Sequence, residues 1–268
     1  MIYTDCHLHS SFSGDSDTPM EDMIRRGIRL GLRTICFTDH MDPEFPESDV
    51  DFGLDTQAYA SRLMELKDKY KEQIEILFGV EFGLQSQLTG FFSRYEKAWP
   101  FDFIIGSSHL LNGTDPYYPE NLAQTSDQEI YRSYFESILY NLKHFDGFQV
   151  YGHLDYIARY VPNQSVPFSY RDYSDLIDAI LKSIIEDGKG IEMNMSGYRY
   201  GLGMPNPCPD ILKRYRELGG EIITVGSDAH TPENVGLRFE KAGEHLVQAG
   251  FKYYTVWKER KPVFIKIC

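Results

Sequence analysis

The sequence predicts an α/β fold with parallel strands, and three observations support this prediction. Short apolar runs alternate with segments of helical period along the whole chain of 268 residues. The connections between the apolar runs are long enough to hold helices, as connections between parallel strands must be. Hydrophobic residues make up 42% of the chain and aromatic residues 14%, which is enough for a sizeable core. Right-handed crossovers leave two architectures open, a doubly wound sheet and a closed barrel.

Seven apolar runs are short enough to be strands of such a sheet. They cover residues 2–9, 33–40, 75–83, 101–109, 147–155, 190–197 and 221–230. The tail at 253–267 lacks helical period and is predicted to be a β-hairpin or edge segment. We find no low-complexity linker and no internal repeat, so we expect a single domain over residues 1–268.

Segments of helical period lie between the predicted strands. They cover residues 19–31, 55–71, 125–145, 169–188 and 206–220. The third segment begins with Thr125 or Ser126 as its N-cap, and Glu129 is placed to complete a capping box from Ser126. Gly188 and the glycine pair at 219–220 mark plausible ends of the last two helices.

Charge and composition limit the possible partners. The formal net charge is −13 and Lys and Arg do not cluster, which argues against a nucleic-acid partner. No stretch of eighteen apolar residues exists, and the first thirty residues are too acidic and too rich in histidine for a signal peptide. The four cysteines lack C-x-x-C spacing and are expected to be buried, reduced thiols. We therefore expect a soluble, cytoplasmic protein with no membrane partner.

Six of the eight histidines fall at or near the C-terminal ends of predicted strands. They are His7, His9, His40, His109, His153 and His230. In a parallel α/β fold these strand ends form the ligand crevice or the active face of the barrel. His7 and His9 project from the same side of one strand, as do Asp228 and His230. Imidazole and carboxylate are the usual ligands of Zn, Fe and Mn, so this pattern predicts a metal site.

Acidic residues extend this set of candidate ligands. Glu81 lies inside a predicted strand, where a metal ion or a salt bridge would have to balance its charge. Asp15 is a further candidate, although its segment could be a polar loop that caps the helix after Pro19. Asp39 could orient a ligand imidazole or stay solvated. Nine candidate ligands exceed the needs of one ion, and two or more ions about 3.5–4 Å apart serve phosphoester hydrolysis.

The motifs that contain these residues resemble those of a known family. In chain order they are DCHLHSSFSGD (5–15), FTDH (37–40), VEFG (80–83), GSSH (106–109), YGHLD (151–155) and GSDAH (226–230). They resemble the polymerase and histidinol phosphatase (PHP) superfamily, most closely its histidinol-phosphate phosphatase branch. The resemblance implies a distorted (β/α)7 barrel in one domain, with a short C-terminal β segment and a cluster of three divalent metal ions, Zn, Fe or Mn.

The resemblance also implies which residues hold each ion. The first ion would be held by His7, His9, Glu81 and Asp228, the second by Glu81, His109 and His153, and the third by Asp15, His40 and His230. The implied reaction is the hydrolysis of L-histidinol phosphate to L-histidinol and inorganic phosphate in histidine biosynthesis, by attack of a metal-bridging hydroxide.

Three further residues are candidates for catalytic roles. Arg159 and Arg199 lie just beyond predicted strands, where a guanidinium can bind phosphate with two hydrogen bonds, although either could be a surface arginine. Asp42 could donate a proton to the leaving alkoxide, or could be a turn residue before Pro43. Substrate choice is expected to depend on the loop 110–121, which contains Asp115, Tyr117 and Glu120.

Three alternatives to this reaction remain. The same metal cluster could act on another small phosphate monoester, such as a nucleotide or sugar phosphate. An amidohydrolase-type deacylase also begins with H-x-H, but we find no obvious strand-end lysine to form a bridging carbamate. A metal-binding or polymerase-accessory module without enzymatic activity is disfavoured because the chain has no polymerase domain and no basic DNA-binding face.

Overall fold

Seven parallel strands follow one another around the sheet in their chain order. The chain was analysed as a computed structural model, which describes residues 1–46, 50–162 and 168–267. The seven strands are β1 (Thr4–Leu8), β2 (Thr34–Phe37), β4 (Glu75–Gly83), β5 (Phe103–Ser107), β6 (Val150–Tyr151), β7 (Gly190–Asn194) and β8 (Ile223–Gly226). A two-residue strand, β3 (His40–Met41), pairs with β4 beside this path.

The strand order of the sheet never reverses, whereas the order in a doubly wound sheet changes direction at a switch point. The observed order is therefore that of a barrel. The two ends of the sheet meet just beyond β8. Leu8 forms a parallel bridge with Ala229, and the backbone N–H of His9 donates to the carbonyl of Ala229 at 2.9 Å. The N–H of Asp228 donates to the carbonyl of His7, also at 2.9 Å. The predicted seven-stranded α/β barrel is therefore confirmed.

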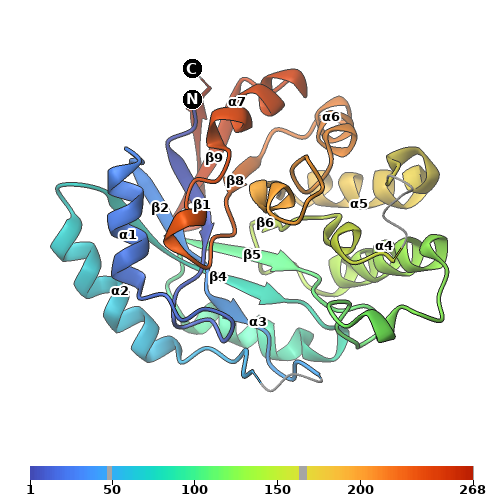
Figure 1. The fold of residues 1–268 in the computed structure, drawn as a ribbon, viewed down its shortest axis with the longest axis horizontal. Helices are drawn as coiled ribbons and strands as arrows, with labels where there is room; N and C mark the ends of the chain where they lie inside the picture. The colour runs from blue at the N-terminus through green and yellow to red at the C-terminus, as the bar shows by residue number, and fades with distance from the viewer. Residues whose placement is uncertain (47–49, 163–167, 268) are drawn as a thin grey trace.

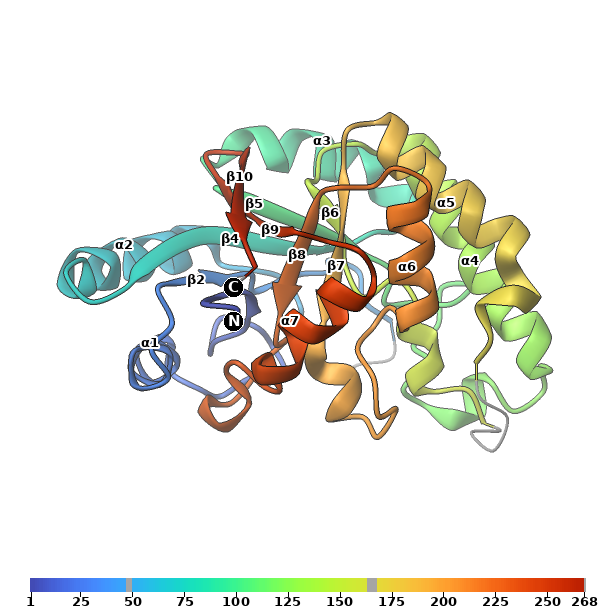
Figure 2. The same cartoon turned by 90° about the horizontal axis from the view of Figure 1, so that it is seen from above.

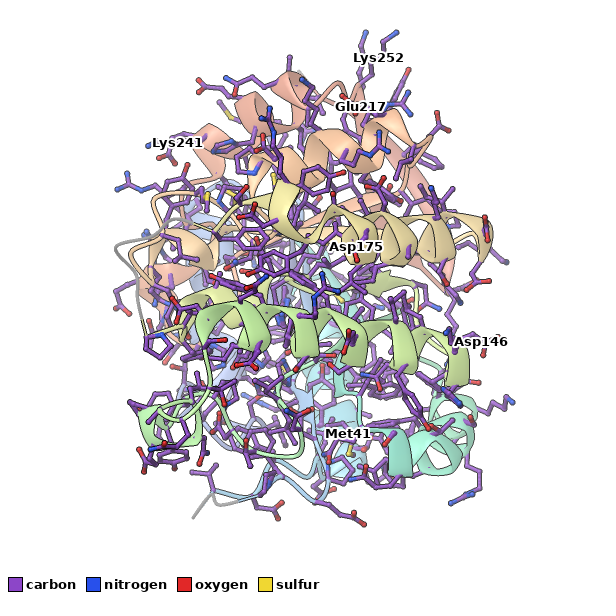
Figure 3. The ribbon with its side chains drawn as sticks, turned by 90° about the vertical axis from the view of Figure 1, so that its right-hand side faces the viewer. Met41, Asp146, Asp175, Glu217, Lys241 and Lys252 are labelled. Carbon is purple, nitrogen blue, oxygen red and sulfur yellow. The ribbon has the colours of Figure 1, made fainter. Side chains whose placement is uncertain are left out.

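In the described part of the chain, seven α-helices surround the strands (Figures 1 and 2). They are α1 (Met20–Arg29), α2 (Thr56–Tyr70), α3 (Thr89–Ala98), α4 (Asp127–His144), α5 (Ser174–Glu186), α6 (Pro209–Glu217) and α7 (Phe239–Gln248). Short 3-10 helices are η1 (Ser86–Leu88), η2 (Pro119–Asn121), η3 (Tyr156–Arg159), η4 (Tyr170–Tyr173), η5 (Met195–Tyr198) and η6 (Pro232–Asn234). Figure 3 shows side chains such as Asp175, Glu217 and Lys241 on the outer surface, where all three are exposed.

Local signals in the sequence account for most of the helix boundaries. Ser126 caps α4 in the predicted capping box, in which its side chain accepts from the N–H of Glu129. Helices α5 and α6 end shortly before Gly188 and Gly219, whose φ angles of 66° and 100° are left-handed and suit glycine. Helix α3 was not predicted; its ten residues include Gly90 and two adjacent phenylalanines.

The predicted strand 190–197 ends at Asn194 and continues as the 3-10 helix η5 from Met195, and two further predicted strands are interrupted. The run 33–40 divides into β2 and β3, and between them Thr38 and Asp39 leave the sheet. The run 147–155 contains only the two-residue strand β6, because His153 adopts a left-handed φ of 21° that ends the strand. Both interruptions occur at the C-terminal end of the barrel, where the chain turns candidate ligands toward a common centre.

The C-terminal tail forms the predicted β-hairpin. Strands β9 (Tyr253–Lys258) and β10 (Lys261–Lys266) pair antiparallel across Glu259 and Arg260, which both have positive φ as a tight hairpin turn requires. Cys6, Cys36 and Cys208 are buried free thiols, as expected, while Cys268 lies outside the described residues. Among the described residues, no helix has the length and apolar character needed to cross a membrane.

Candidate metal centre and active-site cavity

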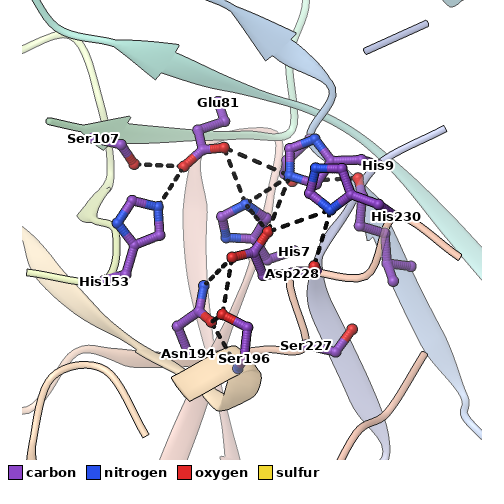
Figure 4. Close-up of polar contacts among 12 residues, drawn as sticks. His7, His9, Glu81, Ser107, His153, Asn194, Ser196, Ser227, Asp228 and His230 are labelled. Atoms are coloured by element: carbon purple, nitrogen blue, oxygen red, sulfur yellow. Dashed lines mark hydrogen bonds and ion pairs between the residues drawn. The ribbon is translucent and has the colours of Figure 1, made fainter. Parts of the chain in front are cut away.

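The six strand-end histidines lie together at the C-terminal end of the barrel. The ring centroid of His9 lies 5.0 Å from that of His7, 4.3 Å from that of His40 and 4.1 Å from that of His230. The centroids of His109 and His153 are 5.3 Å apart. Figure 4 shows Glu81 between His153 on one side and His7, His9 and His230 on the other. Histidines from five different strand ends thus converge with Glu81 of β4 on one centre.

The first predicted ligand group has the spacing of a single metal site. Nε2 of His7 and Nε2 of His9 are 3.0 Å apart, and they lie 3.1 Å and 3.6 Å from Oε2 of Glu81. Oδ1 of Asp228 is 3.9 Å from Nε2 of His7 and 3.6 Å from Nε2 of His9. Ligand atoms around a tetrahedral zinc ion lie roughly 3.3 Å apart. His7, His9 and Glu81 therefore fit one cation, and Asp228 lies beside both imidazoles.

The second group uses the other oxygen of Glu81. Oε1 lies 3.2 Å from Nε2 of His109 and 2.9 Å from Nε2 of His153. Ser107 donates its hydroxyl to the same oxygen at 2.6 Å and so fixes the direction of the carboxylate. Glu81 is only 1% exposed; its Oε1 faces His109 and His153, whereas its Oε2 faces His7, His9 and His40. This arrangement suits a carboxylate that bridges two cations.

The third group is more open than the other two. Oδ2 of Asp15 lies 3.1 Å from Nε2 of His230 and 3.7 Å from Nε2 of His40. The Asp15 side chain is 39% exposed, because it belongs to the loop after β1 and not to a strand. His9, His40 and His230 also lie close enough together to share an ion. Asp15 and His9 are thus alternative third members of this group.

Several buried atoms in the centre lack the hydrogen bonds that burial normally requires. Nδ1 of His40 lies 3.3 Å from Oε2 of Glu81, and Nε2 of His230 lies 3.1 Å from Asp15, yet neither nitrogen makes a hydrogen bond. These nitrogen and oxygen atoms are close together but are not aligned for a hydrogen bond. Atoms that bind the same cation have this arrangement. The donor set and its geometry therefore fit divalent metal ions.

Most of the candidate ligand histidines have their other ring nitrogen held by the protein. Nδ1 of His109 lies 2.6 Å from Oδ2 of Asp42, and Nδ1 of His9 lies 2.9 Å from the hydroxyl of Ser13. That hydroxyl in turn donates to Oδ1 of Asp39 at 2.8 Å. Such contacts fix the ring orientation and leave Nε2 free to bind a metal. Asp39 thus orients a ligand imidazole through a serine.

Burial and neighbouring charges have opposite effects on the pKa values of the groups in the centre. Burial disfavours a charged His7, but the carboxylates of Glu192 and Glu81 outweigh it and hold the pKa of His7 well above its usual value. Burial would raise the pKa of Glu81, yet His7 and His109 hold it well below its usual value. Without a cation, protons on these imidazoles balance the carboxylates. Metal binding must therefore displace protons, and its affinity falls at low pH.

Arg159 is the most rigidly held cation beside the centre. Its guanidinium donates to Ser196 Oγ at 2.7 Å and to Asn206 Oδ1 at 3.2 Å, and it reaches Oδ2 of Asp228 at 3.4 Å. The guanidinium carbon lies 4.8 Å from the ring centroid of Tyr156 and 4.4 Å from that of Tyr200. These contacts hold a planar cation in one orientation beside the metal ligands.

Arg199 also contacts the ring of Tyr200. Its guanidinium carbon lies 5.0 Å from the Tyr200 centroid, and its Nη2 donates to the Tyr200 hydroxyl at 3.3 Å. Burial would raise the pKa of Asp228, but the charges of His7 and Arg159, and to a smaller extent that of Arg199, hold it well below its usual value. Both candidate arginines are therefore close to the centre, although Arg199 is not among the residues that line the cavity described next.

A cavity of about 390 Å³ opens above the candidate metal centre. Its lining includes candidate ligands of all three groups, together with Arg159 and Asp42. Aromatic and aliphatic side chains form the rest of its wall, among them Phe45, Val50, Phe52, Tyr117, Tyr118, Tyr156, Tyr160 and Tyr200. From the predicted specificity loop, Asp115 and Tyr117 line the cavity, whereas Glu120 is exposed and does not.

Sequence reasoning missed the residues that hold the ligands in place. Glu192, Asn194, Ser196 and Asn206 are fully buried and contact candidate ligands or Arg159. Glu81 was identified because it is an acidic residue inside an apolar predicted strand. Glu192 in the run GIEMNMSG is placed in the same way and could have been identified by the same reasoning. The roles of the other three depend on strand register and loop path, which the sequence pattern alone does not specify.

Comparison with known proteins points to one family. A sequence profile of the PHP domain matches residues 5–196 of this chain. The chain is 34% identical to a probable histidinol-phosphatase of Clostridium acetobutylicum, over 89% of this chain and 90% of that protein. It is 30% identical to a histidinol-phosphatase of Lactococcus lactis, over 92% of this chain and 91% of that protein.

A solved structure is similar over nearly the full length. It is the histidinol phosphate phosphatase of Lactococcus lactis in complex with zinc, L-histidinol and phosphate. The TM-score is 0.89 at 28% sequence identity, and the match covers 97% of this chain and 98% of that chain.

Proposed function

The chain belongs to the PHP domain family, and on that premise we propose that it is a metal-dependent phosphomonoesterase that hydrolyses L-histidinol phosphate in histidine biosynthesis. The observation that carries this proposal is the convergence of the candidate ligands around Glu81 at the floor of a cavity with a fixed arginine. The relatives named histidinol-phosphatase support the choice of substrate. A cytoplasmic location is part of the proposal, and the buried free thiols are consistent with it.

The residues around Glu81 would hold the ions in the groups predicted from the sequence. His7, His9, Glu81 and Asp228 would hold one, Glu81, His109 and His153 a second, and Asp15, His40 and His230 a third. Divalent ions at such positions lower the pKa of coordinated water toward about 7 and neutralise phosphoryl oxygens. The native metal is proposed to be Zn, Fe or Mn, which this set of nitrogen and oxygen ligands accepts.

The protein would bind the two ends of the substrate with different groups. Arg159, oriented by Ser196 and Asn206, is placed to bind the phosphate, and Arg199 adds positive charge beside it. Asp115 is 9% exposed and lines the cavity, where its carboxylate can pair with an ammonium group. The tyrosines of the cavity wall provide flat apolar surfaces for an imidazole ring. A cavity with these features suits a phosphorylated amino alcohol.

Asp42 is proposed as the proton donor to the leaving oxygen. Its Oδ2 accepts from Nδ1 of His109, whereas its Oδ1 is buried at the cavity without a hydrogen-bond partner. Oδ1 is therefore the oxygen that would deliver the proton to the leaving group, while Oδ2 keeps the contact with His109. The small Gly83 makes room for this carboxyl, because a Cβ there would come within 2.0 Å of Oδ1.

Phosphate release from a set of monoesters tests the proposed function. We expect metal-loaded protein to have its highest kcat/KM for L-histidinol phosphate, by at least about tenfold over nucleotide and sugar phosphates. A higher kcat/KM for a nucleotide or sugar phosphate would favour the alternative substrate class. No phosphate release from any ester in the presence of Zn, Fe or Mn would refute the phosphatase itself.

Substitution of Asp42 tests the proton donor. We expect Asp42→Asn to lower kcat for L-histidinol phosphate by about 10²-fold, because its alkoxide leaving group needs a proton. The loss with p-nitrophenyl phosphate should be much smaller, since that leaving group is stable as an anion. Equal losses for both esters would instead mean that Asp42 only orients His109.

Substitution of Asp115 tests the recognition of the amine. Asp115→Asn should raise KM for L-histidinol phosphate by about tenfold and leave kcat within a factor of a few, because a charge-assisted hydrogen bond far from the phosphorus is lost. Glu120→Gln in the same loop is the matched control and should behave like the parent protein, since Glu120 does not line the cavity. An unchanged KM in Asp115→Asn would exclude this role.

A further inference from the structure

Glu192 is a buried carboxylate that the proposed reaction does not use. It lies on β7 inside the barrel and has no exposed surface. Its Oε1 lies 2.7 Å from Nδ1 of His7, and its Oε2 accepts from the backbone N–H of His153 at 3.1 Å. Among the ion pairs of the described residues, Glu192 takes part only in the one with His7. One carboxylate thus contacts two candidate ligands from two other strands, β1 and the turn after β6.

The two candidate ligands that Glu192 contacts belong to different metal positions. His7 belongs to the first group and His153 to the second. The contact with His153 is made to its backbone, at the residue where a left-handed φ of 21° turns the imidazole toward Glu81. The contact with His7 is made to the ring nitrogen that faces away from Glu81 and Asp228, as the position of His7 in Figure 4 indicates.

We propose that Glu192 is a positioning residue shared by two metal sites: it fixes the Nδ1–H tautomer of His7 and holds the turn that presents His153. This inference rests on the metal centre proposed above. Because Oε1 accepts the proton of Nδ1, the lone pair of Nε2 points to the common centre. Because Oε2 accepts the N–H of His153, the strained turn keeps the position from which Nε2 of His153 reaches Glu81.

The groups around Glu192 determine which partner each of its two carboxylate oxygens contacts. The side chain of Asn194 donates to Oε2 at 3.0 Å, and its own orientation is fixed because its Oδ1 accepts the N–H of Ser196 at 2.9 Å. Oε2 therefore meets two donors, and Oε1 meets His7. Gly226 keeps this space open, because a Cβ there would lie 2.4 Å from both Oε1 of Glu192 and the Cβ of His7.

This asymmetry makes the isosteric substitution Glu192→Gln informative. The glutamine oxygen would face the two donors at Oε2, so its NH₂ group would face Nδ1 of His7. Nδ1 would then have to accept, the proton would move to Nε2, and that nitrogen could no longer bind a metal. The reverse orientation would set the NH₂ group against the N–H of His153. Either orientation impairs one of the two ligands, although the size and shape of the side chain are kept.

Zinc binding at buffered free zinc concentrations tests the inference. We expect Glu192→Gln to raise the zinc dissociation constant by about 10–100-fold relative to the parent, as measured by elemental analysis after equilibrium dialysis. Glu96→Gln is the matched control. Glu96 is also a buried carboxylate, but it lies on α3 and its ion pairs are with Lys97 and Arg260, not with a candidate ligand. Its zinc affinity should stay within about threefold of the parent value.

Parent-like zinc affinity in Glu192→Gln would overturn the inference, and so would an equal loss in Glu96→Gln. Nitrogen-15 NMR of histidine-labelled, zinc-loaded parent protein gives a second test that needs no variant. It should find His7 protonated at Nδ1, and protonation at Nε2 would overturn the inference. A parent protein that binds no zinc, iron or manganese would refute the proposed function itself, which is a different result from a zinc-binding parent with an unaffected variant.

Discussion

Replacing Glu81 with alanine is expected to lower kcat/KM for L-histidinol phosphate by at least about 10³-fold and to remove bound metal. The physical reason is the position of its two oxygens. Oε1 lies within 3.2 Å of His109 and His153, and Oε2 lies 3.1 Å from His7. No other carboxylate of the described residues touches both of these imidazole groups. Its loss therefore removes a ligand from two proposed positions at once.

A change on the same strand provides the control for Glu81. Glu75 begins β4 at the opposite end of the barrel and pairs with Lys258 at 2.5 Å. Glu75→Ala should keep the metal content and activity of the parent, with at most a small loss of stability, because exposed ion pairs contribute little. Substantial metal binding and turnover in Glu81→Ala would contradict the bridging role.

Replacing Arg159 is expected to have the second largest effect. Arg159→Ala should lower kcat/KM by about 10²–10³-fold, because a cation preoriented toward the phosphate stabilises the transition state. Arg159→Lys should recover little of this loss. An ammonium group cannot reproduce the planar contacts with Tyr156 and Tyr200, nor donate to Ser196 and Asn206 in the same directions.

The metal content of Arg159→Ala shows whether the substitution removes phosphate binding or instead disturbs the metal ligand Asp228. Arg159 reaches Oδ2 of Asp228, so its removal could also disturb a ligand. We expect the metal content of Arg159→Ala to stay near the parent value, because Asp228 keeps Ser196 as a donor at 3.0 Å. Arg132→Ala on the exposed face of α4 is the control and should retain full activity. Parent-like activity in Arg159→Ala would exclude it from phosphate binding.

The arrangement of the barrel could be predicted from the sequence because parallel strands place their C-terminal ends on one rim. That rule brought His7, His109, His153 and His230 together although they are far apart in the chain. It also placed Glu81 among them. Periodicity alone left a doubly wound sheet open, and the family resemblance supported the barrel that the strand order then confirmed.

Other features depend on information that local pattern does not contain. Strand β6 has only two residues, and His153 just beyond it takes a left-handed conformation, which the apolar run around it does not indicate. Asn206 orients Arg159 from a loop whose path depends on tertiary packing. The ligand roles of individual residues, the proton donor and the single-domain organisation stay predictions.

Anomalous diffraction at the zinc edge from crystals of the zinc-loaded protein tests the central claim most directly. We expect strong peaks at the C-terminal rim of the barrel, about 3.5–4 Å apart, with Glu81 between two of them and Nε2 of His7, His9, His109 and His153 in contact with zinc. A map without peaks among these side chains, or with zinc bound only elsewhere on the surface, would contradict the account.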